Sequence, residues 1–178
     1  MLLQYQKVVI LDIEGNSAHA KEELKITQFS AIIIENNEKK EVNFYNRNVN
    51  LIPMVVQHLT HLNLAKLKKE GISERRLIQE IYQILKDADV IYAYGYDFDK
   101  RMIQLMFDKY HFHLQNMNWV DIQEIAKERL NPKHLNLKAL STELGFNETS
   151  FHNSLVDCRA ILHIIDYLEA IEPEKVSV

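Results

Sequence analysis

The stretch Val8-Val9-Ile10-Leu11-Asp12-Ile13-Glu14 joins an apolar run to two closely spaced acids. Its first half is rich in β-branched residues, which predicts a strand buried on both faces of a sheet. Residues two apart leave the same face of a strand, so Asp12 and Glu14 are expected to point in one direction. Two adjacent carboxylates are costly unless a cation or a proton compensates them. A divalent metal ion is the natural compensator, although an isolated pair of this kind also marks the exit of a strand into solvent.

The pattern on either side of this stretch predicts the fold class. Residues 26–34 form a second apolar run, and the polar segment 35–38 separates it from a third run at 42–45. This pattern is typical of an antiparallel meander of three strands. A fourth strand is predicted at residues 90–94 and another short apolar element at 119–120. Between and after them, helical spacing predicts α-helices, so the order favours α/β layers with helices packed on a mixed sheet.

The helices have recognisable ends in the sequence. Ser73 is a plausible N-cap for a helix over residues 77–85, and helical spacing recurs at residues 102–110. A helix from about residue 122 to 129 is stopped by Pro132. The next begins near Asn136 and ends at Gly145, and the last extends over residues 155–168.

Composition bounds the kind of protein. The chain has 178 residues, and its 47% hydrophobic and 26% charged residues are typical of a globular protein. We expect a single domain over residues 1–172 with a short C-terminal tail, 173–178. A single cysteine, Cys158, cannot form an internal disulfide, and no segment approaches the ~18 apolar residues of a membrane span. These features predict a soluble cytoplasmic protein without a membrane partner.

Net charge gives no indication of a nucleic-acid ligand. Lys and Arg number 21 against 25 Asp and Glu, for a formal net charge of −4. A local basic groove or bound metal ions would make the electrostatic potential positive at a binding site even when the net charge is negative. Bulk acidity therefore does not decide the partner.

Further acids occur at the ends of other predicted elements. Asp97 and Asp99 follow the fourth strand, and His152 and Asp157 stand at the head of the last helix. Asp99 is the favoured ligand because it leads into a helix, and Asp97, on the same strand-like face, is the alternative. Four carboxylates can hold two divalent ions ~3.5–4 Å apart, the arrangement used in phosphodiester hydrolysis. His152, with a pKa near neutrality, could deprotonate water.

Three segments in a fixed order carry a resemblance to a known family. They are residues 8–14, residues 90–99 ending in Phe98-Asp99, and residues 152–157 with a histidine five residues before an aspartate. Together they resemble the motifs of the DEDDh (DnaQ-like) 3′-5′ exonucleases. That family includes DNA polymerase III epsilon-type proofreading exonucleases and ribonuclease T. The resemblance covers nearly the whole chain.

The resemblance implies both a fold and a set of roles. The fold is ribonuclease H-like, with a five-stranded mixed sheet (a three-stranded antiparallel meander plus two parallel strands) flanked by helices. The implied cofactors are two divalent cations, Mg²⁺ or Mn²⁺. Asp12 bridges them, Glu14 and Asp157 complete the nucleophile side, and Asp99 binds the second ion through water. His152 becomes the general base.

Substrate contacts are expected around this centre. Residues 59–62 resemble the segment that lines the 3′-terminal nucleotide pocket, and Phe98 is a candidate for stacking on a base. Two departures from the family pattern concern substrate handling: Gly15-Asn16 stands where small hydroxyl residues are common, and Tyr94-Gly95 replaces a His-Asn pair. The substrate-binding prediction comprises Gly15, Asn16, Leu59, Thr60, Phe98 and His152.

The predicted function is metal-dependent hydrolysis of the 3′-terminal phosphodiester bond of single-stranded DNA or RNA, releasing 5′-mononucleotides. One alternative is a catalytically impaired nucleic-acid or nucleotide-binding module on the same fold. A weaker alternative is a metal-dependent phosphatase of nucleotides. The sequence does not decide between DNA and RNA as the substrate. It also leaves open whether the protein forms a homodimer and whether it binds a polymerase or another protein partner.

Overall fold

A computed structural model describes residues 3–16 and 24–171 of the chain. Its strands form one five-stranded sheet in the order β3-β2-β1-β4-β5. β1 pairs antiparallel with β2, and β2 with β3, whereas β4 lies parallel to β1 and β5 parallel to β4. The predicted meander and the two parallel strands are therefore confirmed. The strands are β1 (Lys7–Gly15), β2 (Ile26–Glu35), β3 (Glu38–Tyr45), β4 (Val90–Ala93) and β5 (Trp119–Asp121).

Helices connect and cover these strands. The Ser73 hydroxyl accepts the backbone amide of Arg76, and the Asn136 side chain accepts that of Ala139, so both predicted N-caps are confirmed. Two short helices between β3 and α3 were not predicted. The helices are α1 (Met54–Thr60), α2 (Leu64–Glu70), α3 (Glu74–Leu85), α4 (Asp97–Tyr110), α5 (Ile122–Leu130), α6 (Leu137–Glu143) and α7 (Ser154–Ile171).

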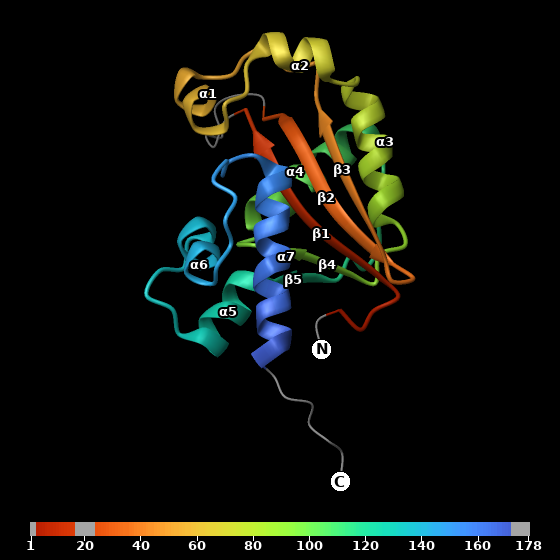
Figure 1. Cartoon of the computed structure of the whole chain (residues 1–178). Coiled ribbons are helices and arrows are strands. Elements are labelled where there is room, and N and C mark those ends of the chain that lie inside the picture. The colour runs from red at the N-terminus through yellow and green to blue at the C-terminus, as the bar shows by residue number, and fades with distance from the viewer. Residues whose placement is uncertain (1–2, 17–23, 172–178) are drawn as a thin grey trace.

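The sheet separates two apolar layers. Val9, Leu11 and Ile13 of β1 pack with residues of α3 and α4, while Val8 and Ile10 pack on the opposite face with residues of α5, α6 and α7. In Figure 1, α7 crosses one face of the sheet. Residues 8–11 have no exposed surface, which agrees with the prediction of a strand buried on both faces. β1 is thus held rigidly up to the point where its acids begin.

Strand lengths leave an opening beside these acids. β4 pairs with β1 only as far as Ile10, opposite Tyr92, and ends at Ala93. β1 continues to Gly15, with a register shift against β2 between Glu14 and Gly15. The end of β1 therefore lacks a β4 neighbour, and the carboxylate of Asp99, at the start of α4, accepts the backbone amide of Ile13 there.

A small separate apolar cluster holds the segment around α1 and α2, and its buried residues are Val49, Ile52, Leu62 and Leu67. Within residues 3–16 and 24–171, no helix has the length and apolar character needed to cross a membrane. The tail at 173–178 lies outside the described residues, so the predicted domain limits stay a prediction.

Candidate active site

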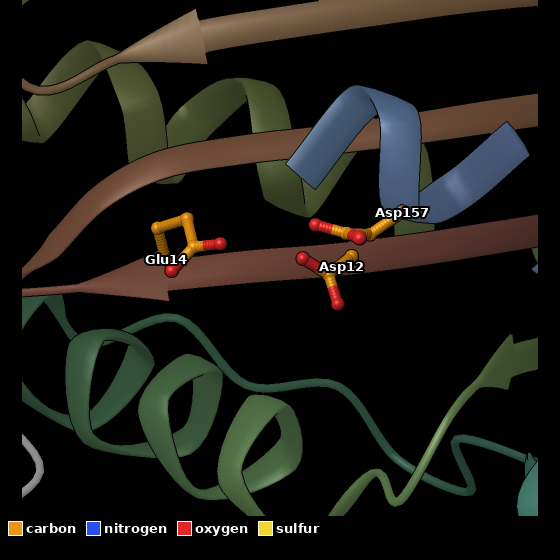
Figure 2. Close-up of side chains that lie close together, drawn as sticks. All are labelled: Asp12, Glu14 and Asp157. Carbon is orange, nitrogen blue, oxygen red and sulfur yellow. The ribbon is translucent and has the colours of Figure 1, made fainter. Parts of the chain in front are cut away.

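Three carboxylates converge at the end of β1. Asp12 and Glu14 leave the same face of the strand, as their spacing predicts, and Asp157 reaches them from the first turn of α7 (Figure 2). One oxygen from each of the three lies within 4.8 Å of the others. Segments more than 140 residues apart in the chain thus form one acidic cluster.

Asp99 approaches this cluster from the opposite layer. It lies in the first turn of α4 with 5% of its surface exposed, and its charge raises the pKa of Asp12. Its carboxylate accepts a hydrogen bond from the backbone amide of Ile13, on the stretch of β1 that β4 does not reach. Asp99 is not part of the group that lies within 4.8 Å. It therefore flanks the three-carboxylate cluster.

Asp97 does not share a face with Asp99. Their spacing predicted that both lie on one strand-like face, but α4 begins at Asp97, and residues two apart on a helix diverge. Asp97 is exposed to solvent, whereas Asp99 is buried. The expectation of a shared face was wrong because the strand ends earlier than the apolar run suggested.

Burial raises the pKa values of all four acids, and repulsion from neighbouring acids adds to the rise at Asp12 and Glu14. Burial is the largest cause for Asp12, whose pKa is raised well above its usual value, with further contributions from Asp99, Asp157 and Glu14. Burial, Asp157 and Asp99 raise the pKa of Glu14 to about 8. Burial raises the pKa values of Asp99 and Asp157 to about 7, despite backbone amides that favour their ionised forms. Nearby positive charge would therefore favour ionisation of the whole cluster at neutral pH.

The donor set fits hard divalent cations. Carboxylate oxygens are the ligands that Mg²⁺ prefers, and Mn²⁺ accepts the same set. Asp12, Glu14 and Asp157 would hold one ion directly, with Asp99 positioned toward a second. Each bound cation would remove the repulsion that raises these pKa values.

His152 lies just ahead of α7 in a left-handed backbone conformation, with φ at 62°. Its backbone amide donates a hydrogen bond to the Asp157 carboxylate, while its side chain is exposed. Partial burial of the ring, Lys138 and His61 lower the pKa of the imidazole below its usual value. This shift favours the neutral ring, the form that accepts a proton. His61 is the C-cap residue of α1, so its effect on His152 indicates that the end of α1 lies near the site.

The predicted nucleotide-pocket segment occupies the end of α1. Leu59 is 49% exposed, and Met54 and Val55 on the same short helix are also exposed. Thr60 is buried, and its hydroxyl donates to the Val56 carbonyl (2.8 Å) and accepts the Leu62 amide (3.2 Å). Leu59 is available for contact, whereas the Thr60 hydroxyl serves the turn that ends the helix.

The remaining predicted substrate residues are less open. Asn16 is 5% exposed, and its Oδ1 accepts the backbone amide of Lys25 at 2.8 Å, which joins the two ends of the β1–β2 connection. Gly15 lies at the register shift that follows Glu14. Phe98 packs partly against the apolar layer under α3 and α4. The structure thus gives Asn16 and Phe98 structural contacts, and their substrate roles stay predictions.

Tyr94-Gly95, the departure from the family's His-Asn pair, forms the turn between β4 and α4. Gly95 has a φ of 67° and donates its amide to Asp121 Oδ1 at 2.9 Å. The Tyr94 hydroxyl donates to the Leu135 carbonyl at 2.6 Å. A glycine suits the left-handed conformation, so this pair anchors the turn that delivers Asp99.

A layer of polar side chains beneath α7 was not predicted. Gln28 Nε2 donates to Asn43 Oδ1 and to Asn153 Oδ1, both at 3.0 Å. Ser30 contacts Ser154, with 2.7 Å between their hydroxyl oxygens. The signal was present in the sequence, because polar residues at 28 and 30 interrupt an apolar run with the period of one strand face. This layer connects β2 to the start of α7.

Comparison with known proteins assigns the family. Residues 9–165 match the family model of the RNase T type, described as exonuclease. The chain belongs to the exonuclease family. The match runs from β1 into α7, so it includes all four acids and His152.

Individual relatives of this exonuclease domain are distant and longer. It is 27% identical over 124 residues to the 3′-5′ exonuclease DinG of Bacillus subtilis, covering 68% of this chain and 13% of that protein. The complex of E. coli exonuclease I with single-stranded DNA has a TM-score of 0.83 at 16% identity, covering 96% of this chain and 42% of the other. A 3′-exonuclease that recognises a histone mRNA stem-loop has a TM-score of 0.76 at 13% identity, covering 93% of this chain and 64% of the other. These neighbours share the ribonuclease H-like fold, and the domain spans less than two thirds of each.

Proposed function

We propose that this domain is a metal-dependent 3′-to-5′ exonuclease that removes 5′-mononucleotides from the 3′ end of single-stranded DNA or RNA. The observation that carries the proposal is the cluster of Asp12, Glu14 and Asp157 within 4.8 Å, flanked by Asp99. The activity named for DinG and the single-stranded DNA bound to E. coli exonuclease I support the direction and the substrate class.

The four carboxylates bind the cofactor in this proposal. Two Mg²⁺ or Mn²⁺ ions would activate the attacking water and stabilise the charge that develops on the phosphate in the transition state. Asp12, Glu14 and Asp157 fix the ligand oxygens, because two come from a buried strand and the third from a helix whose first turn is held by backbone hydrogen bonds. Asp99 lies on the opposite side, held by the amide of Ile13.

His152 serves as the general base. Its neutral imidazole takes a proton from the attacking water, which requires the form that its lowered pKa favours. The ring is exposed while its backbone is tied to Asp157, so it can turn toward the acids without displacing them. Lys138, whose positive charge lowers the pKa of His152, is our candidate for contacting the phosphate that carries the scissile bond.

In this proposal, the nucleic acid upstream of its 3′ end contacts two kinds of protein surface. Exposed apolar side chains of α1, including Met54, Val55 and Leu59, are suited to contact bases. Exposed Lys68 and Lys69 on the adjacent α2 are suited to contact phosphates. Together these surfaces extend the site along a single strand rather than enclosing a mononucleotide.

Product analysis separates this proposal from the other readings. A 3′-terminal nucleotide should be released as the 5′-monophosphate, identified by chromatography, from an oligonucleotide incubated with the domain and Mn²⁺. Release of inorganic phosphate from mononucleotides, with intact oligonucleotide, would indicate a phosphatase. Binding without any product would indicate the impaired binding module.

A further inference from the structure

Gln28 lies inside the molecule beside the acidic cluster. It stands opposite Glu14 in the antiparallel ladder of β1 and β2, so the two side chains leave the same face of the sheet. Gln28 has no exposed surface. Burying a polar amide is costly unless its donors and acceptor are hydrogen-bonded, so the contacts of Gln28 indicate what it does here.

The Gln28 amide leads directly to the start of α7. Its Nε2 donates to Asn153 Oδ1 at 3.0 Å, and the same oxygen accepts the backbone amide of Leu155 at 3.2 Å. The Asn153 carbonyl accepts the amide of Asp157 at 3.0 Å. Asn153 therefore caps α7, and Gln28 holds the cap.

The orientation of these amides follows from chemistry. The backbone N–H of Leu155 can only donate, so the Asn153 atom that it meets is the oxygen. The Gln28 atom facing that oxygen is then the nitrogen, whose second hydrogen goes to Asn43. Gln28 Oε1 is left buried without a hydrogen-bond partner among the described residues. Such an orphaned acceptor is unfavourable, so stability alone does not account for a glutamine here.

The cap controls two elements of the proposed chemistry. The backbone amides of His152 and Asn153 both donate to the Asp157 carboxylate. A shift of Asn153 would therefore move the acid and the base together relative to Glu14. Ser30 and Ser154 make a second link between the same elements, but one residue further into the helix.

We propose that Gln28 is a positioning residue that fixes His152 and Asp157 against Asp12 and Glu14 through Asn153. The proposal rests on the proposed exonuclease function. Gln28 touches no reacting atom in this account, and it acts only through the cap of α7.

The test combines Gln28→Met with Asn153→Ala in a double-mutant cycle, and Asn43→Ala is the matched comparison. Gln28→Met removes the donor while keeping the length of the side chain, and Asn43→Ala removes the other acceptor of Gln28 but leaves the bond to Asn153. Gln28→Leu is made in parallel in case the methionine variant does not fold. Initial rates against oligonucleotide concentration give kcat and KM separately.

We expect Gln28→Met to lower kcat by at least about 10-fold, since small misplacements of reacting groups are costly, while KM changes less than about twofold. The double variant should be no slower than Asn153→Ala alone, because both substitutions remove the same link. Asn43→Ala should lower kcat far less than Gln28→Met does. A kcat for Gln28→Met within about twofold of the original protein, or losses that multiply in the double variant, would overturn the proposal.

A metal-free measurement keeps this inference separate from the proposed function. Amide hydrogen exchange of residues 152–157 in EDTA should accelerate in Gln28→Met and not in Asn43→Ala. If the original protein degrades no oligonucleotide, the exonuclease proposal fails on its own, and unchanged exchange in Gln28→Met would then reject the positioning role as well.

Discussion

The Asp157 carboxylate accepts a hydrogen bond from the backbone amide of His152, five residues earlier in the chain. The proposed metal ligand and the proposed base thus belong to one hydrogen-bonded turn at the start of α7. The imidazole itself is exposed, so it can approach a water molecule. Mutations that keep this turn should separate metal binding from proton transfer.

His152→Gln should separate them. Removing a general base typically costs ~10²–10⁴-fold in rate, and we expect kcat to fall within that range. The dissociation constant for Mn²⁺, measured by calorimetry, should change little because the backbone amide that supports Asp157 is retained. His113→Gln, at an exposed position away from the cluster, is the control and should keep normal activity.

Asp12→Asn should make the metal-free protein more stable while abolishing activity. The substitution replaces a buried acid whose pKa is raised by burial and by Asp99, Asp157 and Glu14. We expect the free energy of unfolding in EDTA at pH 8 to rise by about 1–2 kcal/mol, as is common when a strained active-site group is replaced. Urea unfolding measures it. Asp97→Asn, at an exposed site, should change stability by less than about 0.5 kcal/mol. Destabilisation by Asp12→Asn would contradict the electrostatic account.

Stability of the metal-free protein should fall as pH rises. The pKa of Glu14 is raised to about 8 and those of Asp99 and Asp157 to about 7, so the folded state binds more protons than the unfolded state from about pH 4 to pH 8. The free energy of unfolding therefore decreases across this window. Unfolding in urea with EDTA at pH 5.5 and pH 8 tests the direction. Saturating Mn²⁺ should reverse the trend, and greater metal-free stability at pH 8 would disagree with these shifts.

Lys68→Gln combined with Lys69→Gln should weaken substrate binding without slowing the chemistry. Each phosphate contact contributes to the dependence of affinity on salt, so KM should rise and its salt slope should become shallower by up to about two. The expected kcat is unchanged. Lys39→Gln combined with Lys40→Gln, on the exposed strand β3, is the matched control and should leave KM unaltered.

Much of the fold followed from local patterns in the chain. The strand at β1 was predictable because its apolar run is uninterrupted, and the caps at Ser73 and Asn136 because their side chains meet amides three residues on. Helices α1 and α2 were missed, since each has only seven residues and too few turns to display helical periodicity.

Only part of the candidate site was predictable from residue spacing. Spacing placed Asp12 and Glu14 on one face, but nothing local indicated that Asp157 would lie within 4.8 Å of them. That required the family resemblance. The burial of Thr60 and the contact of Asn16 with Lys25 depend on tertiary packing, which sequence spacing does not encode. The same is true of the bond between Gln28 and Asn153, which lie 125 residues apart.

The most direct test of the central claim follows a 5′-labelled single-stranded oligonucleotide on a sequencing gel. With Mn²⁺ or Mg²⁺, the original protein should shorten it one nucleotide at a time from the 3′ end, and EDTA should stop the reaction. The doubly substituted protein, Asp12→Asn with Glu14→Gln, should leave the oligonucleotide intact although it remains folded. Equal shortening by that variant, or shortening in EDTA, would contradict a metal-dependent site built on these carboxylates.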